Sequence, residues 1–197
     1  AQNLTLIIRA GAGYDTIDSA YAAERGIYVA NCPGKNSIAV AELAIALILA
    51  IDRRIPDCVA ELRAGKWNKK EYGKARGLTG RTIGILGLGA IGEAVAHRAL
   101  GMEMKVLAWS RSLTEDRAEE LGIARAASPI DVARHCDAVT VHLASTSETK
   151  GIVDRVFFDT MKEGALFVNT SRGELVDTAA MRAAMWVETW ATVTPRW

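Results

Sequence analysis

The chain has 197 residues, of which 50% are hydrophobic and 24% are charged, and its formal net charge is +1 at pH 7. These values are typical of a globular protein with a sizeable core, and they exclude the basic bias with which many proteins attract nucleic acids or anionic membranes. The longest apolar run, residues 38–51, is interrupted by Glu42 and is shorter than the roughly 18 residues that a membrane span needs. We therefore expect neither a nucleic-acid partner nor a membrane partner.

The three cysteines, Cys32, Cys58 and Cys136, are scattered and follow neither a metal-ligand spacing nor a C-x-x-C spacing. An odd number of unclustered cysteines is typical of a protein whose thiols stay reduced, so we expect a cytoplasmic location and no metal site. Each cysteine is expected to pack as a small buried hydrophobe.

The first predicted strand, residues 4–9, runs into a glycine turn at residues 10–13. Glycines let the backbone turn tightly and leave N–H groups exposed, and such a turn can hold a carboxylate. A short helix over residues 15–25 and a strand over residues 27–30 follow. Because regular structure is predicted from Leu4 onward, we expect this chain to be a fragment.

Asn36 and Ser37 are good helix-capping residues, and they open a helix that is predicted to run to Arg54. This helix is apolar nearly all round, which predicts burial on most sides, as for a helix held between two domains. A shorter helix is predicted after Pro56, over residues 57–64.

Residues 66–76 are basic and contain interleaved aromatic side chains. One interpretation of this composition is a surface that binds nucleic acid or a phosphorylated substrate. The other, which we favour, is a solvated connector whose aromatic side chains pack down on the protein.

The sequence is organised around a strand, a glycine turn and a helix. Residues 82–86 form a short apolar run, the turn carries glycines at positions 87, 89 and 92, the helical pattern ends at Gly101, and residues 105–109 give a second strand. In such a turn the first glycine permits the bend, the second lets backbone approach a pyrophosphate, and the third lets helix and strand pack closely. The helix N-terminus then presents N–H groups to the phosphates. The pattern predicts a dinucleotide site, and the alternative is a turn whose glycines serve packing only.

Strands and helices continue to alternate along the chain. Thr114 and Ser128 are predicted helix caps, and strands are predicted over residues 138–143 and 165–170. Such alternation implies an α/β fold with a doubly wound parallel sheet and right-handed crossovers. The remaining predicted elements are a helix over residues 154–162 and a helix that Asp177 caps and that reaches at least Met185.

The composition changes from Trp186 onward, because three of the five tryptophans fall in this last part of the chain. The helical spacing of Trp186, Trp190 and Val193 predicts a terminal helix packed on the sheet. The alternative is that the native sequence of the parent protein stops before this tail.

With these motifs in view, the chain resembles the D-isomer-specific 2-hydroxyacid dehydrogenases, most closely their D-3-phosphoglycerate dehydrogenase-like members. The resemblance implies a Rossmann NAD(P)-binding domain, incomplete, over residues 36–185, a remnant of an α/β substrate domain over residues 1–35, and an atypical tail over residues 186–197. The motifs that carry it are Arg9-Ala10-Gly11-Ala12-Gly13-Tyr14-Asp15, Asn31-Cys32-Pro33-Gly34-Lys35-Asn36-Ser37, the glycine turn, and Asn169-Thr170-Ser171-Arg172-Gly173.

In that family, hydride moves between the nicotinamide of NAD(P) and C2 of a small 2-hydroxy or 2-keto acid. The resemblance implies that Arg172 is catalytic, because a guanidinium that stays charged can bind the substrate carboxylate and polarise the reacting carbonyl. The alternative is an arginine at a strand end that pairs with a surface carboxylate. The substrate-binding positions implied are Ala10, Gly11, Ala12, Gly13 and Asn36. The cofactor-binding positions implied are Ser37, Gly87, Gly89, Ala90, Ile91, Gly92, Ser110, Arg111, His142, Leu143, Thr170, Ser171 and Arg172.

The resemblance favours 3-phosphoglycerate as the substrate, in serine biosynthesis, and leaves glyoxylate, hydroxypyruvate and formate open. It also implies a homodimer, for which residues 38–51 are the expected surface unless they are buried within the chain. Two other classes remain, a non-catalytic NAD-sensing co-repressor and a methyltransferase or other nucleotide-binding protein. The motif at residues 169–173 argues against the last class.

Two features depart from the family pattern, and the first concerns catalysis. The proton-transfer pair of the family, a histidine oriented by a glutamate, corresponds to positions beyond Met185, and Glu188 should not be mistaken for that glutamate. Of the histidines present, His97 and His135 are expected to be solvated, and His142, at a strand end, is expected to be structural or to line the cofactor site. We therefore expect no turnover by this chain alone.

The second departure concerns the cofactor. NAD-specific members end their second strand with an acidic residue that binds the ribose hydroxyls, whereas this chain has Ser110, followed by Arg111 and Ser112. No carboxylate is there to repel a 2′-phosphate, and Arg111 has the charge to pair with one. We hypothesise that NADP(H) is tolerated or preferred. The alternative is that Arg111 points to solvent and that backbone contacts bind NAD.

Overall fold

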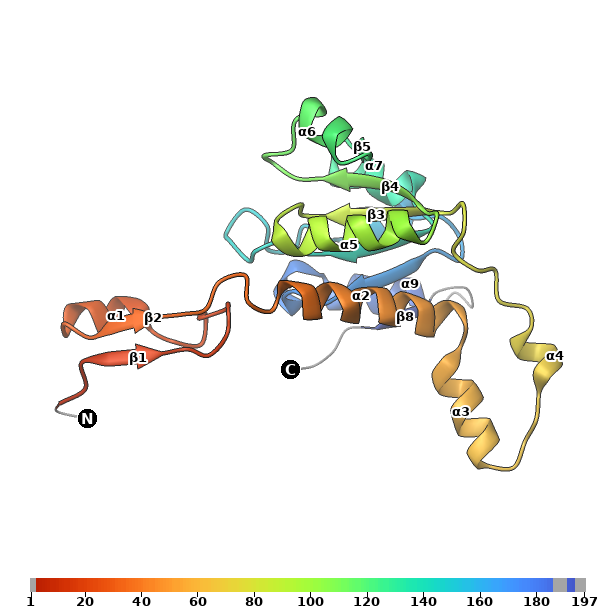
Figure 1. Ribbon diagram of the computed structural model, residues 1–197, viewed down its shortest axis with the longest axis horizontal. Helices are drawn as coiled ribbons and strands as arrows, with labels where there is room; N and C mark the ends of the chain where they lie inside the picture. Colours follow the sequence, from red (N-terminus) through yellow and green to blue (C-terminus); the bar gives the residue numbers. More distant parts are fainter. Residues whose placement is uncertain (1–2, 186–190, 194–197) are drawn as a thin grey trace.

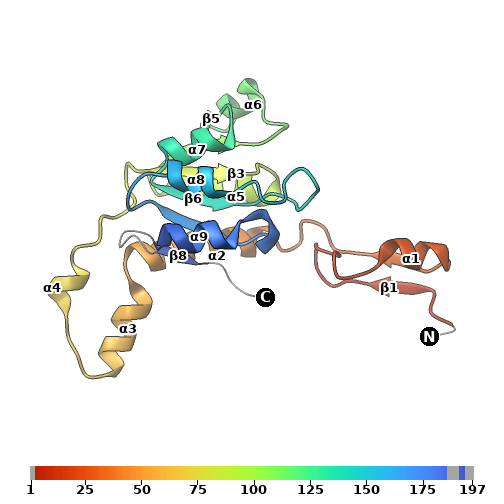
Figure 2. The same cartoon turned by 180° about the vertical axis from the view of Figure 1, so that it is seen from behind.

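The protein, described by a computed structural model over residues 3–185 and 191–193, is built on a six-stranded parallel sheet. The strand order is β5-β4-β3-β6-β7-β8, and helices cover both faces (Figures 1 and 2). This arrangement confirms the predicted doubly wound α/β fold. The strands are β3 (Thr82–Leu86), β4 (Lys105–Trp109), β5 (Ala124–Arg125), β6 (Ala138–Val141), β7 (Leu166–Asn169) and β8 (Ala191–Val193).

Two helical layers sandwich the sheet, and each has its own hydrophobic core. Because successive strand residues point to opposite faces, Ile83 and Ile85 pack under the first layer, whereas Leu86 packs under the second. The first layer contains α2 (Ser37–Asp52), α5 (Ala90–Gly101) and α6 (Glu115–Glu120), and the second contains α7 (Pro129–His135), α8 (Arg155–Thr160) and α9 (Thr178–Met185), which follows the short helix η1 (Gly173–Leu175).

The local signals in the sequence correctly placed the centre of this sheet. β3 and β4 begin and end at the predicted residues, and α5 ends at Gly101 as predicted. The Thr114 hydroxyl accepts a hydrogen bond from the Arg117 N–H at 3.2 Å, so it caps α6 as predicted. Ser128 caps α7 in the same way, with a distance of 3.2 Å to the Asp131 nitrogen.

Two parts of the chain project from this body, one at each end of α2 (Figures 1 and 2). Near the N-terminus, β1 (Leu6–Ile8) and β2 (Tyr28–Ala30) form a separate parallel pair beside α1 (Ser19–Glu24). At the other end, α3 (Ile55–Arg63) and α4 (Lys69–Tyr72) form an arm. The division into units at residues 35 and 185 stays a prediction.

The burial of α2 is one-sided over its first half, which corrects the prediction that it is buried on most sides, whereas residues 47–52 include no exposed residue. Ile38 is 54% exposed and Leu43 is 37% exposed on the outer side. A helix that is apolar all round gives no periodic signal, so its sequence does not reveal which side packs on the body. The buried residues are Ser37, Ala41, Ala44, Ile45 and Ile48.

The basic connector over residues 66–76 also differs from its prediction. It contains the short helix α4, and its Trp67 is 77% exposed, so this aromatic side chain does not pack down. Tyr72 is half-buried, and the Arg54 guanidinium lies 5.1 Å from the centre of its ring.

The prediction of a terminal helix is wrong for the part of the tail that the structure describes. Residues Ala191–Val193 form β8, which pairs in parallel with β7. Trp186 and Trp190 lie outside the described residues.

All three cysteines are free thiols, but only one is the buried hydrophobe that was predicted for each. Cys136 is fully buried, and burial raises the pKa of its thiol to about 12. Cys32 and Cys58 are half-buried. In the part of the chain that the structure describes, no helix has the length and apolar character needed to cross a membrane.

Candidate active site

The glycine turn between β3 and α5 has the geometry of a phosphate-binding turn. Gly87 has a φ of +96°, and a Cβ atom there would lie 2.8 Å from the carbonyl carbon of His142. A Cβ atom at Gly92 would lie 2.1 Å from the Gly87 oxygen, so this glycine lets α5 pack against the turn. A Cβ atom at Gly89 would meet no described atom within 4 Å, so the backbone at the start of α5 is open to a ligand.

A cavity of about 570 Å³ lies at the carboxyl edge of the sheet. Because the strands are parallel, the loops after β3, β6 and β7 all meet at this edge, and the strand order reverses beside β3. Ligands of open α/β sheets bind at such a position. The cavity is lined by Ala12, Gly13, Tyr14, Asp15, Asn36, Val40, Ile91, His142, Leu143, Ala144, Ser145, Thr170, Ser171, Arg172 and Glu174.

The structure thus brings half of the predicted site residues to one cavity. Those that do not line it are Ala10, Gly11, Ser37, Gly87, Gly89, Ala90, Gly92, Ser110 and Arg111. Sequence reasoning assigned no role to six residues that do line it, namely Tyr14, Asp15, Val40, Ala144, Ser145 and Glu174.

Arg172 is held at the end of β7 by a buried asparagine to which the sequence analysis assigned no role. Asn169 donates from Nδ2 to the Arg172 carbonyl oxygen at 2.8 Å, and its Oδ1 accepts from the N–H and hydroxyl of Ser171 at 2.9 and 2.8 Å. These bonds fix the turn that aims Arg172 toward the cavity. A buried polar residue that ends an apolar strand is the signal that was available for this role.

Arg172 forms a bidentate ion pair with Asp15, which lies in the N-terminal lobe, the projecting part that contains β1, α1 and β2. Arg172 Nη2 and Nε donate to Asp15 Oδ1 at 2.7 Å and Oδ2 at 3.0 Å. The hydrogen bonds to Arg172 lower the pKa of Asp15, and those to Asp15 raise the pKa of Arg172. Arg172 thus pairs with a carboxylate, as the alternative interpretation expected, and it also lines the cavity. Its catalytic role stays a prediction.

The turn at residues 10–13 packs directly on Arg172. A Cβ atom at Gly13 would lie 2.0 Å from Arg172 Nη2, so a side chain at this position would displace the guanidinium from where it lies. The Asn31 carboxamide donates to the Ala12 oxygen at 2.7 Å and fixes the turn. The Gly11 N–H donates to the Arg9 oxygen, whereas the N–H groups of Ala12 and Gly13 have no acceptor among the described residues.

His142 lies directly after β6 and contacts the glycine turn through its backbone. Burial lowers the pKa of its imidazole from 6.5 to about 4, so the ring is neutral at pH 7. Its Nε2 lies 3.0 Å from the Thr140 hydroxyl, and its buried Nδ1 has no partner among the described residues. This environment suits a neutral group that lines a ligand site.

The loop after β4 carries Ser110 and Arg111, as the sequence indicates. The Ser110 hydroxyl lies 3.5 Å from that of Ser112, and no acidic residue follows β4 directly. Arg111 does not simply point to solvent, because its guanidinium pairs with the carboxylate of Glu148 in the loop after β6.

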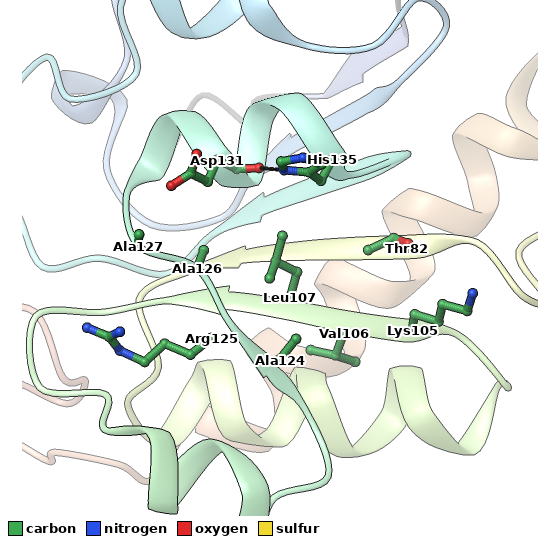
Figure 3. A pocket seen from close by; sticks show the side chains of 10 residues that line it. All are labelled: Thr82, Lys105, Val106, Leu107, Ala124, Arg125, Ala126, Ala127, Asp131 and His135. Atoms are coloured by element: carbon green, nitrogen blue, oxygen red, sulfur yellow. Dashed lines mark hydrogen bonds between the residues drawn. The ribbon is translucent and has the colours of Figure 1, made fainter.

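The other two histidines lie outside the cavity. His97 and His135 are exposed, as predicted. His135 borders a second hollow of about 480 Å³ between α7 and strands β3, β4 and β5, together with Asp131, Thr82 and Lys105 (Figure 3). Thr82 and Lys105 begin their strands, so this hollow lies toward the amino ends of the strands, away from the candidate active site.

Comparison with known proteins identifies relatives over nearly the whole chain. A family model for the NAD binding domain of D-isomer specific 2-hydroxyacid dehydrogenases matches residues 45–193. D-3-phosphoglycerate dehydrogenase of Archaeoglobus fulgidus is 42% identical over 185 residues, which are 94% of this chain and 35% of that protein. Glyoxylate reductase of Thermococcus litoralis is 40% identical over 194 residues, and the match covers 94% of this chain and 57% of that protein.

A solved structure of a related protein also matches this chain over nearly its whole length. The crystal structure of a phosphoglycerate oxidoreductase from Vibrio cholerae superimposes with a TM-score of 0.86 at 35% identity, covering 97% of this chain and 61% of that one. The chain therefore spans less than two thirds of the length of each of these relatives. From the match of its cofactor domain, we conclude that the chain belongs to the D-isomer-specific 2-hydroxyacid dehydrogenase family.

Proposed function

We propose that this chain is the cofactor-binding part of an NAD(P)-dependent enzyme that transfers hydride between a nicotinamide and a D-2-hydroxy or 2-keto acid. The observation that carries the proposal is the contact of Arg172 with the turn at Gly13, inside a cavity at the carboxyl edge of the sheet. We take 3-phosphoglycerate as the leading substrate because of the named relatives, and the relative named glyoxylate reductase keeps smaller 2-keto acids open.

The residues present fit a dinucleotide. Gly89 leaves space for a pyrophosphate at the start of α5, where the first N–H groups of the helix have no partner within the helix. Gly87 and Gly92 supply the bend and the close packing that hold this space open. When bound, the nicotinamide supplies or accepts the hydride. His142, neutral and adjacent to the turn, lines the site without adding charge.

The substrate carboxylate would be bound by backbone and side-chain donors together. The N–H groups of Ala12 and Gly13 are available, and Arg172 Nη1 donates only to the Ser171 oxygen among the described residues. Asp15 holds the other side of the guanidinium and so fixes its plane. An arginine fixed in this way stabilises negative charge on the reacting oxygen and keeps its own proton.

The direct test is a fluorescence titration of the purified chain with NADH and with NADPH at matched ionic strength. We expect at least one of the two to bind. Binding of neither would contradict the proposal that this chain forms the cofactor site.

For the choice of cofactor, we propose that NADP(H) is tolerated or preferred. The support is the absence of a carboxylate directly after β4, where Ser110 stands, whereas the nearby Arg111 guanidinium is paired with Glu148. Ser110→Asp should shift the affinity ratio toward NADH, because the new carboxylate would bind ribose hydroxyls and repel a 2′-phosphate. An unchanged ratio would contradict this proposal.

A second candidate is a non-catalytic NAD-sensing module. The cavity and the glycine turn would serve such a module equally well, because cofactor binding alone does not require turnover. The cytoplasmic location stays a prediction in either case. Turnover distinguishes the two functions. In a version of the chain extended to include the proton-transfer pair, only the enzyme would oxidise or reduce the substrate.

We also propose that the intact protein is a homodimer that pairs through α2 and α3. Helix α3 has no buried residue, yet Ile55, Val59 and Leu62 follow one side of it and are 47%, 41% and 55% exposed. In the first half of α2, Ile38 and Leu43 are also exposed, at 54% and 37%. A single helix with no fully buried residue is marginal in water, so a second copy covering this side would stabilise it.

A further inference from the structure

The Arg111–Glu148 ion pair connects two loops that lie on opposite sides of β3. Arg111 follows β4, and Glu148 belongs to the loop after β6. β3 pairs with both of these strands, so it lies between them in the sheet. The glycine turn and the start of α5 directly follow β3. The ion pair therefore spans the carboxyl edge above the turn that we assign to the pyrophosphate.

The pair also lies where the cofactor ribose is expected. In dinucleotide-binding folds the end of the second strand contacts the ribose hydroxyls, and here that position is Ser110, directly before Arg111. The Arg111 guanidinium is the cation nearest in sequence that could meet a 2′-phosphate. This guanidinium already forms an ion pair with Glu148. The neighbouring cation, Lys150, is also paired, with Glu174 at 3.7 Å.

We propose that Glu148 is a specificity-determining residue that disfavours a 2′-phosphate on the cofactor. Its carboxylate occupies the Arg111 guanidinium that would otherwise bind the phosphate, and its own negative charge repels a dianion at this place. NADH lacks the 2′-phosphate, so it meets no such competition. This inference rests on the proposed cofactor site, and it names the residue whose removal releases Arg111 for NADP(H).

The side chains of Arg111 and Glu148 are 62% and 67% exposed. Solvent therefore screens their charges, and the effect of Glu148 on the affinity for NADPH is modest. We expect Glu148→Gln to tighten NADPH binding by about fivefold at low ionic strength, as for one unit charge acting on a dianion across a few ångströms of solvent. The affinity for NADH should change by less than about twofold, and the gain for NADPH should shrink as salt is added.

The experiment is a fluorescence titration of the full chain with NADH and NADPH, for the wild type and four variants. Glu148→Gln and Arg111→Gln test each partner, and the double variant tests whether the gain depends on Arg111. Glu120→Gln is the matched control, because it removes the same charge from an exposed glutamate that pairs with Arg117 on α6. Circular dichroism checks that each variant is folded.

Three results would bear on the inference in different ways. A tighter NADPH complex in Glu148→Gln, absent from Glu120→Gln and lost in the double variant, supports it. Unchanged NADPH affinity in Glu148→Gln, in a chain that binds NADH normally, overturns it and leaves the proposed function intact. Binding of neither cofactor to any form overturns the cofactor site and the inference with it.

Discussion

Gly89 and Gly92 belong to the same turn, yet a methyl group added at each position meets different surroundings. At Gly89 it enters open space, and at Gly92 it lies 2.1 Å from a backbone oxygen. We therefore expect Gly89→Ala to keep its unfolding free energy within about 1 kcal/mol of the wild type, because only the N-cap preference changes. NADH binding should weaken at least tenfold, since the methyl group fills the space for the pyrophosphate.

Gly92→Ala should behave in the opposite way, losing about 1–3 kcal/mol of unfolding free energy because α5 must move away from the turn. Urea unfolding and NADH titration of the two variants, side by side, measure both effects. A Gly89→Ala chain that binds NADH as tightly as the wild type would show that this glycine does not border the pyrophosphate.

His142 makes a pH-dependent contribution to stability that follows from its burial. The unfolded imidazole takes up a proton below pH 6.5, whereas the folded one resists protonation until about pH 4. The stabilising effect is therefore complete above pH 6.5 and is lost as the pH falls from 6.5 toward 4. The shift corresponds to about 3 kcal/mol.

We expect the unfolding free energy of His142→Gln to fall less steeply over this range than that of the wild type. Urea titrations at several pH values measure the slope, and His135→Gln, at an exposed histidine, is the control. Parallel slopes for the wild type and His142→Gln would show that this histidine is not buried in its neutral form.

At the scale of the element, α3 gives the sharpest test of the homodimer. Leu62→Lys places a charge in the apolar stripe formed with Ile55 and Val59, and burying an unpaired charge in an interface is costly. We expect at least a tenfold rise in the dimer dissociation constant, measured by analytical ultracentrifugation. Ala60→Lys, which adds the same charge away from this stripe, should leave the constant within about twofold.

A wild-type chain that sediments as a monomer at all accessible concentrations would contradict the proposed homodimer. Equal weakening by Leu62→Lys and Ala60→Lys would place the contact elsewhere than on the apolar stripe of α3.

Elements whose signals are local could be predicted from the sequence, and those that depend on distant contacts could not. β3 and β4 have their predicted bounds because apolar runs and glycines determine them within a few residues. α2 was placed correctly, but its packed side was not, because its apolar residues show no period. The strand β8 was missed because its structure depends on pairing with β7.

At the scale of the whole molecule, the same distinction applies to the candidate site. The glycine turn was predictable from spacing, since all its parts lie within six residues of sequence. The pairing of Asp15 with Arg172 joins residues 157 positions apart, and that of Arg111 with Glu148 joins residues 37 positions apart. A periodic pattern in the sequence carries no information about such distant contacts. Only the fold shows that the N-terminal lobe supplies Asp15 as the partner of Arg172.

The whole molecule also determines whether this chain can complete the reaction. Reduction of a 2-keto acid needs a proton as well as a hydride, and a guanidinium does not give up its proton at neutral pH. Within the cavity, His142 is almost entirely unprotonated at pH 7 because its pKa is about 4. The carboxylate of Asp15 is paired with Arg172, which lowers the pKa of Asp15, so it is not an acid at this pH.

We therefore expect the purified chain to bind NADH but to show no steady NADH or NADPH oxidation with hydroxypyruvate or phosphohydroxypyruvate, followed by absorbance. Arg172→Gln is the control for a contaminating dehydrogenase, whose rate would be the same in both preparations. Oxidation that scales with chain concentration and is lost in Arg172→Gln would contradict the expectation. It would mean that a proton donor is assembled from water or from residues outside the described ranges, and that the arginine and the glycine turn suffice to bring substrate and cofactor together.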